Sequence, residues 1–469
     1  MTRSELELEN AFFLFEPDIA QELADLLHPE HQVPLPIQTA ALYLLEALVR
    51  QRSRVQEVST ALNLSAGHGI LMVILRRVFA DSYPLTSSAT LAFVDALNVL
   101  LSTITANSTG GQLIISAGIV PAVVSFLTNR QRPHKRSVGK MTRILDNLIY
   151  SFASAFTSFC NANGISTLVE RIGHEVQECL ECGSDLPTAN LLKDLLRFLH
   201  HMMQTAGTAD RLRNLVETAL PKTMVHIVRF PGLFGPSVYV YTINIMASFI
   251  HNEPTSLAIL QEFNLPQTFL QAVKKHVPVS GDVINTLPNA FGAVCLNQAG
   301  LDYFTELDPF PEYFAIFTQM AYVRPLQESD VPATAGTGID ELIRHHPSLK
   351  TRVLECIKQT LAEIREFGKP DGLPAQETPG KHHLSTSTDP PPSSERVLSP
   401  DDMVLSQMIE AVCRFLEGLL QQPHHRQDLV QGLGVDFIFD FLKLPALPYD
   451  FFQSRGWGAL VGLFKTVVE

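Results

Sequence analysis

A unit of three apolar helical segments recurs along this chain and restricts the possible fold more than any other feature. Each copy has an apolar helix, a polar break, a second helix stopped by a helix breaker, and an apolar third helix. The clearest copies span residues 96–127, 242–273, 287–317 and 408–442. A unit of this size cannot bury its own apolar face, so neighbouring units must stack in an array. The pattern therefore predicts an all-α fold, an irregular armadillo- or HEAT-like α-solenoid that forms a superhelix.

The residues that interrupt the units support this prediction. Gly118 and Gly434 can adopt the left-handed backbone conformation that ends a helix, and Asn264 does so nearly as readily. Pro121 and Pro266 suit the first turn of the next helix, where no backbone donor is required. Because the copies diverge and their spacing varies, we expect an irregular array and not a consensus repeat.

Changes in composition divide the chain into four predicted segments. They are an N-terminal segment to which the sequence assigns no fold (1–33), an armadillo-like helical solenoid (34–366), a flexible linker rich in Pro, Ser and Thr (367–400), and C-terminal helical repeats that continue the solenoid (401–469). The linker contains Pro390–Pro392, which forbids a helix. We also expect a shorter irregular insert at Val323–Gly338, where prolines and glycines gather.

Composition limits the compartment and the partners. With 46% apolar and 18% charged residues, the chain is too apolar to be disordered. The most apolar stretch, Ile114–Leu127, is too short and too interrupted to span a bilayer, and the N-terminus shows no secretory signal. Six sparse cysteines indicate free thiols in a reducing compartment, so we expect a cytoplasmic or nuclear protein. The formal net charge of −13 disfavours general nucleic-acid binding.

The motifs of common enzyme classes are missing from the sequence. We find no nucleophile elbow, no phosphate-binding loop and no HExxH pair, and we predict no catalytic, cofactor-binding or metal-binding residue and no cofactor. Cys179 and Cys182, with His174 upstream, form half of a possible zinc site, but four ligands are needed and two thiols on a partly buried helix are the simpler interpretation. Histidine pairs occur at 200–201, 345–346, 382–383 and 424–425, and adjacent helical residues diverge too far to share one ion.

A basic stretch at residues 129–143 leaves two alternatives open. It gathers six cations after an apolar segment and contains Pro133, so we expect an exposed loop. Such a run is either simply solvated or serves as a nuclear-import signal or a phosphate-facing patch.

Five strings of the sequence carry a family resemblance. They are residues 164–181, 234–257, 286–304, 338–351 and 429–451. Together, and in this order, they closely resemble the N-terminal armadillo-like region, called DUF913, of the giant HECT-type E3 ubiquitin ligases of the Mule family. The resemblance extends from about Thr86 to the end of the chain.

The resemblance implies a role in protein ubiquitination. In that family helical repeats form a scaffold that gathers substrates, and a C-terminal HECT domain carries the catalytic cysteine. Leu186–Ala189 resembles the start of the HECT cysteine motif, but the cysteine is missing, and we predict a loop leading into a helix at Leu191. The predicted function is therefore a scaffold and substrate-recruitment segment, inactive alone, whose partners are protein substrates and ubiquitin-pathway proteins and not membranes or nucleic acids.

The alternative is a stand-alone armadillo-type adaptor unrelated to ubiquitin. Importin-type solenoids carry arrays of tryptophan along a groove, whereas this chain has only Trp457, which we expect to anchor the last helix. That helix, 457–468, is apolar on several sides, which favours a chain that continues beyond Glu469.

Overall fold

Helices form every regular element in the described part of the chain. The computed structural model describes residues 18–205, 207–328, 330–368, 400–421, 426–427, 431, 434 and 436–468, and no strand is assigned among them. Contacts divide the chain into two compact units, residues 1–248 (unit 1) and 249–469 (unit 2). The all-α prediction is therefore confirmed.

Unit 1 is built from short connections between helices of moderate length. Its elements in chain order are α2 (Ile19–Asp25), η1 (Pro29–His31), α3 (Leu35–Arg50), η2 (Arg52–Arg54), α4 (Val55–Ala61), α5 (Ile70–Phe79), α6 (Ser88–Ala106), α7 (Ser108–Ser116), α8 (Ile119–Leu127), η3 (Arg132–His134), α9 (Lys135–Ser151), α10 (Ala153–Asn161), α11 (Gly164–Cys182), α12 (Leu186–Gln204), α13 (Ala209–Leu212), η4 (Arg213–Glu217), α14 (Leu220–Arg229), α15 (Pro231–Phe234) and α16 (Pro236–Asn252), whose last residues belong to unit 2.

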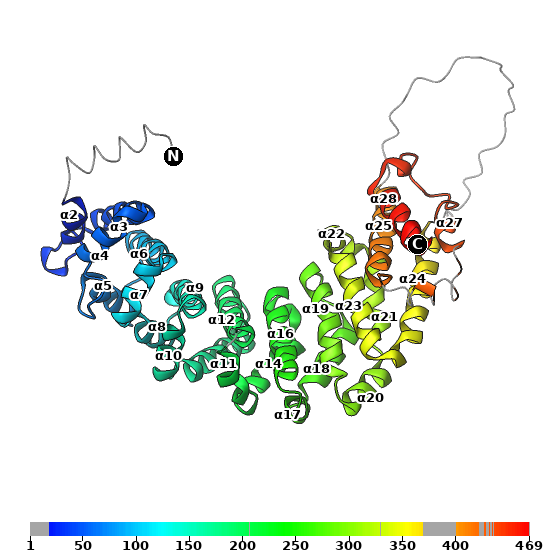
Figure 1. Ribbon diagram of the computed structural model, residues 1–469, viewed down its shortest axis with the longest axis horizontal. Helices are drawn as coiled ribbons and strands as arrows, with labels where there is room; N and C mark the ends of the chain where they lie inside the picture. The colour runs from blue at the N-terminus through cyan, green and yellow to red at the C-terminus, as the bar shows by residue number, and fades with distance from the viewer. Residues whose placement is uncertain are drawn as a thin grey trace, which may run out of the picture. The chain divides into compact units, whose positions relative to one another are not determined.

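These helices form two layers. One layer holds α3, α6, α9 and α12, which lie side by side in chain order, each packed on the next (Figure 1). The other layer includes α7, α8, α10 and α11, which pack on one another and cover the first layer. Because each helix contacts mainly its neighbours, the predicted stacking of helices in an array is confirmed within unit 1.

The predicted helix breakers act as expected. Gly118 has a φ of 93° immediately before α8, and Asn264 has a φ of 58° immediately before α18 (Leu265–Lys275). Gly434 also lies in the left-handed region, with a φ of 73°. Pro266 stands in the first turn of its helix, where its missing N–H leaves no hydrogen bond unmade.

Unit 2 continues with the same kind of element. After the end of α16 it contains α17 (Ser256–Glu262), α18 (Leu265–Lys275), α19 (Gly281–Val294), α20 (Gln298–Leu307), α21 (Phe310–Phe314), η5 (Ala315–Phe317), α22 (Met320–Gln327), α23 (Val331–His345), η6 (Pro347–Leu349), α24 (Lys350–Phe367), α25 (Pro400–Leu419), α27 (Asp436–Phe441), η7 (Phe451–Gln453) and α28 (Arg455–Val468). Within it α19, α23, α25 and α28 pack one on the next.

The predicted irregular insert at Val323–Gly338 is wrong, because α22 and α23 cover most of it. Its glycines serve close helix packing instead of a loop. A Cβ on Gly336 would lie 2.0 Å from the carbonyl oxygen of Phe415 on α25, and one on Gly338 would lie 2.8 Å from Pro288 on α19. Glycine therefore lets α23 approach both neighbours closely.

A buried tyrosine supplies the hydrogen bond that a proline inside α19 cannot make. Pro288 has no N–H to offer the carbonyl of Ile284, one turn earlier. The hydroxyl of Tyr313, which is fully buried, donates a hydrogen bond to that carbonyl at 3.2 Å. The contact fixes α21 against α19 and leaves no unpaired carbonyl at the break.

Two predicted segments fall largely outside the described residues. Residues 1–17 of the N-terminal segment are not described, and α2 and η1 occupy most of its remainder. Residues 369–399 of the predicted linker are likewise not described, so the linker stays a prediction; α24 ends at Phe367 and α25 begins at Pro400.

One described helix is long and apolar enough to cross a membrane. It is α6, and more than half of its apolar stretch is buried inside the protein. The pair α7 and α8 passes the same test only as a span bent by 71°. Since α6 packs between α3 and α9, its apolar character fits a core helix.

Candidate functional site

Four charged side chains meet inside unit 1, where α9 approaches α11. The Nζ of Lys135 lies 2.9 Å from Glu175 Oε2 and 2.8 Å from Glu178 Oε1, and it donates a hydrogen bond to Thr188 Oγ1 at 2.8 Å. Burial opposes the charge of Lys135, but the hydrogen bonds to Glu178 and Glu175 outweigh burial and raise its pKa. The fourth member, Arg171, completes what we call the buried charge cluster.

Arg171 joins this cluster to the end of α8. Its Nε lies 2.8 Å from Glu175 Oε1, and its Nη1 donates to the carbonyl oxygens of Leu127, at 2.9 Å, and Asn129. Burial lowers the pKa of Arg171, an effect that Glu175 opposes. The arrangement satisfies carbonyls that the end of a helix leaves without partners, so it holds the α8–α9 connection against α11.

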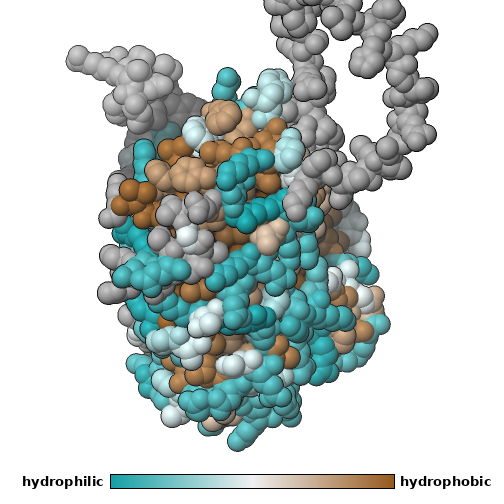
Figure 2. Space-filling model, turned by 90° about the vertical axis from the view of Figure 1, so that its right-hand side faces the viewer, coloured by the Kyte–Doolittle hydropathy of each residue, from teal (hydrophilic) through white to brown (hydrophobic). Residues whose placement is uncertain are grey.

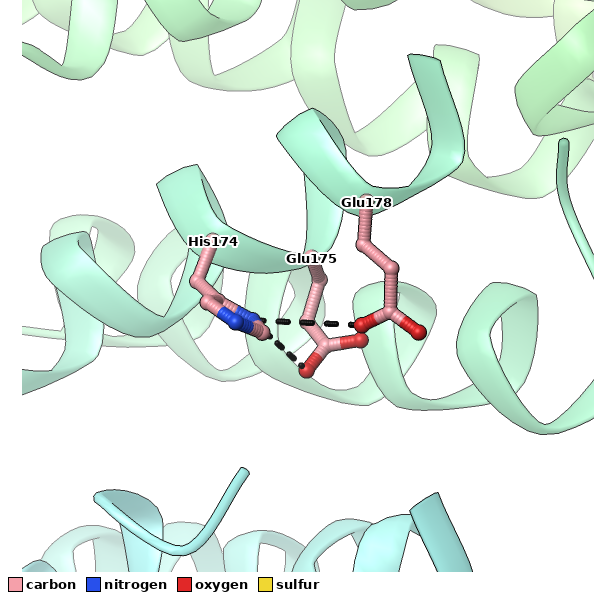
Figure 3. Close-up of side chains that lie close together, drawn as sticks. All are labelled: His174, Glu175 and Glu178. Atoms are coloured by element: carbon pink, nitrogen blue, oxygen red, sulfur yellow. Dashed lines mark ion pairs between the residues drawn. The ribbon is translucent and has the colours of Figure 1, made fainter. Parts of the chain in front are cut away.

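One group in the described residues has the donor types of a metal site. His174, Glu175 and Glu178 bring one ligand atom each within 4.8 Å of one another (Figure 3). However, the oxygens of Glu175 already face Arg171 and Lys135, and Glu178 faces Lys135. A divalent cation would have to displace a buried ammonium group, so the group fits an ion-pair network better than a metal site.

The cysteines occupy mostly buried positions. Cys179 is buried and Cys182 is exposed, although both belong to α11. Burial raises the pKa of Cys179, that of Cys295 to about 12, that of Cys356 to about 11, and that of Cys413 as well. Since a thiolate is the reactive form, these buried thiols are poor nucleophiles at neutral pH.

The histidine pair on α12 diverges as the helix geometry predicts. His201 Nδ1 lies 2.7 Å from Asp146 Oδ1, and its ring stacks on Tyr150 with centroids 5.0 Å apart. His200 instead faces Tyr241. Burial, with a smaller effect of His201, lowers the pKa of His200 to about 4, so this imidazole is neutral near pH 7. The pairs at 382–383 and 424–425 lie outside the described residues.

The short string that resembles a HECT motif is the start of a helix. Asp185 accepts a hydrogen bond from the backbone N–H of Thr188 at 2.9 Å and caps α12. Its hydrogen bonds to Thr188, together with Arg132, lower the pKa of Asp185 to about 2. The helix begins at Leu186, five residues before the predicted Leu191, because the cap and Pro187 in the first turn both favour initiation there.

The basic stretch at 129–143 is not the exposed loop that the sequence predicts. It forms η3 and the first half of α9, and Pro133 occupies the first turn, where it breaks nothing. Val138 and Met141 are buried, which fixes one face of α9 on the core. The cations of the stretch are therefore distributed by the helix: some point inward and others outward.

Five of the six cations in the stretch pair with carboxylates on other helices or at helix caps. Lys135 is buried as described, and Arg132 pairs with Asp185. The remaining pairs are Arg136 with Asp95 at 3.1 Å, Lys140 with Asp95 at 2.5 Å, and Arg143 with Asp194 at 3.5 Å. These pairs connect α9 to α6 and α12, so the stretch ties three helices of one layer together.

Two hollows lie on this layer and share a wall on α9. The first, of about 520 Å³, lies between α3, α6 and α9, and the second, of about 600 Å³, lies between α9 and α12. We call them together the basic trough. Its lining includes Lys140 and Arg143 in the shared wall, Arg50 and Asn98 in the first hollow, and Lys193 and Arg197 in the second.

A separate groove of about 690 Å³ lies within unit 2, between the end of α16, α19 and α23. Its lining is mostly uncharged: His251 Nε2 lies 3.2 Å from Asn289 Oδ1, and Asn285 Oδ1 is buried without a hydrogen-bond partner in the described residues. The predicted pair His345–His346 also lines this groove, and burial lowers the pKa of His346.

Apolar side chains gather at the end of unit 2 formed by α25, α27 and α28. Figure 2 shows this face, with apolar residues concentrated in its upper part. Phe439 on α27 is 44% exposed and Phe452 is 61% exposed, so both offer contact area. Trp457, the predicted anchor of the last helix, stands in the first turn of α28 and meets Phe452 edge-on, with ring centroids 5.1 Å apart.

Two family models match this chain. The model described as "Domain of Unknown Function (DUF913)" matches residues 139–387 and 375–450, more than half of the chain. The model described as "Domain of Unknown Function (DUF908)" matches residues 1–80. The first match confirms the resemblance found in the sequence; the second concerns the N-terminal segment, whose family the sequence analysis did not identify.

Several curated proteins are similar to nearly the whole chain. It is 28% identical over 98% of its length to "E3 ubiquitin-protein ligase ptr1" of Schizosaccharomyces pombe. It is 27% identical over 93% to "E3 ubiquitin-protein ligase UPL1" of Arabidopsis thaliana, and 26% identical over 98% to "E3 ubiquitin-protein ligase HUWE1" of Mus musculus. The chain spans only 12% to 14% of the length of these three relatives.

Solved structures give a weaker likeness. A computationally designed armadillo repeat protein for modular peptide recognition is 15% identical and covers 58% of this chain, with 98% of the designed chain covered, at a TM-score of 0.41. A score of that size supports no argument, and the fold is established by the helices themselves.

Proposed function

The chain belongs to the DUF913 family, and from that membership we propose that it is a scaffold and substrate-recruitment segment of a HECT-type E3 ubiquitin ligase. The observation that carries the proposal is the similarity of 93% to 98% of this chain to E3 ubiquitin-protein ligases of a fungus, a plant and a mammal. The assignment to the HECT type rests on the resemblance of the five sequence strings.

The stacked helices give this role a physical basis. A layer of parallel helices presents a long surface on which a partner can make many modest contacts. A partner bound there is held at a raised effective concentration near any ligase module on the same polypeptide. The proposed partners are protein substrates and ubiquitin-pathway proteins, and the proposed compartment is the cytoplasm or the nucleus, supported by the six free cysteines.

Catalysis is assigned to a HECT domain outside this chain. HECT chemistry passes ubiquitin through a cysteine thioester, which requires a reactive thiolate. Four of the six cysteines are buried and have raised pKa values, and neither the half-buried Cys160 nor the exposed Cys182 lies in a HECT-type motif. We therefore propose that the chain supplies binding and position, and that it forms no ubiquitin thioester alone.

The test uses the native gene product with an affinity tag placed before Met1. Immunoblotting gives its size, and the captured protein is incubated with ubiquitin, E1 and E2. We expect a product far larger than the 51.9 kDa of this chain and a ubiquitin adduct that thiol removes, whereas the purified chain gives no adduct. A product near the mass of this chain that captures no ubiquitin-transfer activity would favour the alternative, a stand-alone adaptor. A thiol-sensitive adduct on the purified chain would overturn the assignment of catalysis elsewhere.

A further inference from the structure

We propose that the basic trough of unit 1 binds an extended acidic segment of a protein partner. The proposal rests on the proposed scaffold function and names the chemistry of what the scaffold recruits. The trough lies on the layer formed by α3, α6, α9 and α12, so its lining comes from four helices in succession.

The charge of the trough is opposite to that of the chain. The whole chain has a formal net charge of −13. In the trough, by contrast, Arg136 and Lys140 share the single carboxylate of Asp95. Lys193 is exposed and makes no ion pair within the described residues. Positive charge is therefore left over along this layer, and it favours an anionic ligand.

Amide side chains add a second and independent feature. Asn98, Asn147 and Asn190 come one each from α6, α9 and α12, and all three line the trough. Asn98 is only 4% exposed, and its Nδ2 has no hydrogen-bond partner among the described residues. A buried amide donor without an acceptor is costly, and a carboxylate or peptide carbonyl of a ligand would satisfy it.

The lining favours a peptide over a nucleic acid. Val99 and Leu186 are exposed in the two hollows and offer apolar contacts to side chains. The residues that line the hollows include no aromatic side chain, although single-stranded nucleic acids are usually held by stacking on such groups.

The test measures fluorescence anisotropy with the full chain. The probes are a fluorescein-labelled peptide of alternating Glu and Gly, matched peptides with Gln or Lys in place of Glu, and a labelled oligothymidylate. We expect the Glu peptide to bind most tightly, and its affinity to fall as salt is added.

Two variants place the binding in the trough. Arg143→Gln with Lys193→Gln removes one cation from the shared wall and one from the second hollow, and we expect binding about tenfold weaker. The matched control, Lys275→Gln with Lys358→Gln, removes two exposed cations of unit 2 and should bind like the parent chain. Asn98→Leu should weaken binding while the thermal unfolding midpoint stays equal or rises, because it removes an unsatisfied donor.

Three results would overturn the proposal: no preference for the Glu peptide, tighter binding of oligothymidylate, or equal loss of binding in the control variant. None of these results would contradict the scaffold proposal, because that proposal is tested separately by ubiquitin transfer with the captured native product. Conversely, a stand-alone gene product without ubiquitin-transfer activity would contradict the scaffold proposal, while the anisotropy measurements would still decide whether the trough binds an acidic peptide.

Discussion

Lys135 shows that a local charge pattern can predict the wrong burial for a single residue. It lies in a run of cations, where the sequence predicts solvent exposure, yet its side chain is fully buried. Its partners Glu175 and Glu178 are distant in sequence, and only the packing of α9 near α11 brings them together. One local signal was available: Arg171 and Glu175 are four residues apart on an apolar helix, a spacing that favours an ion pair.

Replacing Lys135 with Met should destabilise unit 1 strongly. The substitution leaves the carboxylate of Glu175 buried with fewer partners, and removing one member of a buried pair typically costs about 3–5 kcal/mol. Urea unfolding monitored by circular dichroism measures the loss. The control is Lys193→Met, an exposed lysine of α12, for which we expect little change. Equal stability of the two variants would contradict a structural role for the buried charge cluster.

His200 should make stability depend on pH in a defined range. Its pKa of about 4 in the folded chain lies below the ordinary histidine value of about 6.5. The neutral imidazole is therefore favoured by folding, so its contribution is complete above pH 6.5 and is lost as the pH falls toward 4. His200→Gln should flatten the decline of unfolding free energy in this range, by at most about 1.4 kcal/mol per pH unit. Between pH 7 and 8 the slopes of the two proteins should coincide; a parallel decline below 6.5 would refute the assignment.

At the scale of the elements, the sequence predicts correctly the role of glycine, asparagine and proline residues that lie between helices. It misleads where such residues lie inside a helix, on a face that packs against a neighbour. Gly118 and Asn264 end helices in the left-handed conformation, as their sequence context indicates. Gly336 and Pro288 belong to the same residue types but lie inside α23 and α19. Sequence alone does not show that a neighbouring helix approaches at Gly336, so the second use of these residues could not be predicted.

Because Pro288 offers no N–H to the carbonyl of Ile284, the hydroxyl of Tyr313 should contribute to stability in addition to the packing of its ring. Tyr313→Phe removes the donor to the carbonyl of Ile284, which leaves a buried acceptor unpaired at a cost of about 1–3 kcal/mol. In a Pro288→Ala background the new backbone N–H can serve that carbonyl, so the same substitution should cost clearly less. A double-mutant cycle by chemical denaturation measures the difference. Equal costs in both backgrounds would show that the hydroxyl does not replace the missing N–H.

At the scale of the whole molecule, the stacked architecture was predictable and the surfaces were not. The recurring three-helix unit indicates an array because no unit can bury its own face. The basic trough draws Arg50, Lys140 and Lys193 from three different helices, and their convergence depends on how those helices stack. The one visible signal is the spacing of Lys140, Arg143 and Asn147, which places a polar stripe on one face of α9.

Damage to one stacking contact should remain local. Gly336→Ala places a Cβ 2.0 Å from the carbonyl oxygen of Phe415 and must push α23 from α25. Hydrogen exchange should therefore quicken in α23, α25 and their neighbours, while α3 and α6 of unit 1 keep their protection. The control is Gly292→Ala, whose Cβ meets only Leu342 at an ordinary 3.9 Å. Faster exchange throughout the chain would indicate cooperative unfolding instead.

A nuclear transport receptor that reads a basic peptide needs the peptide extended and accessible along its length. In this protein Lys135 is sealed inside the buried charge cluster, and the residues from Lys135 onward are wound into α9. Binding of the stretch by the receptor would require unfolding of the start of α9 and loss of the buried ion pair between Lys135 and Glu175. The folded chain therefore does not present residues 129–143 as an extended import signal, and we expect any nuclear entry to use a different segment or a bound partner.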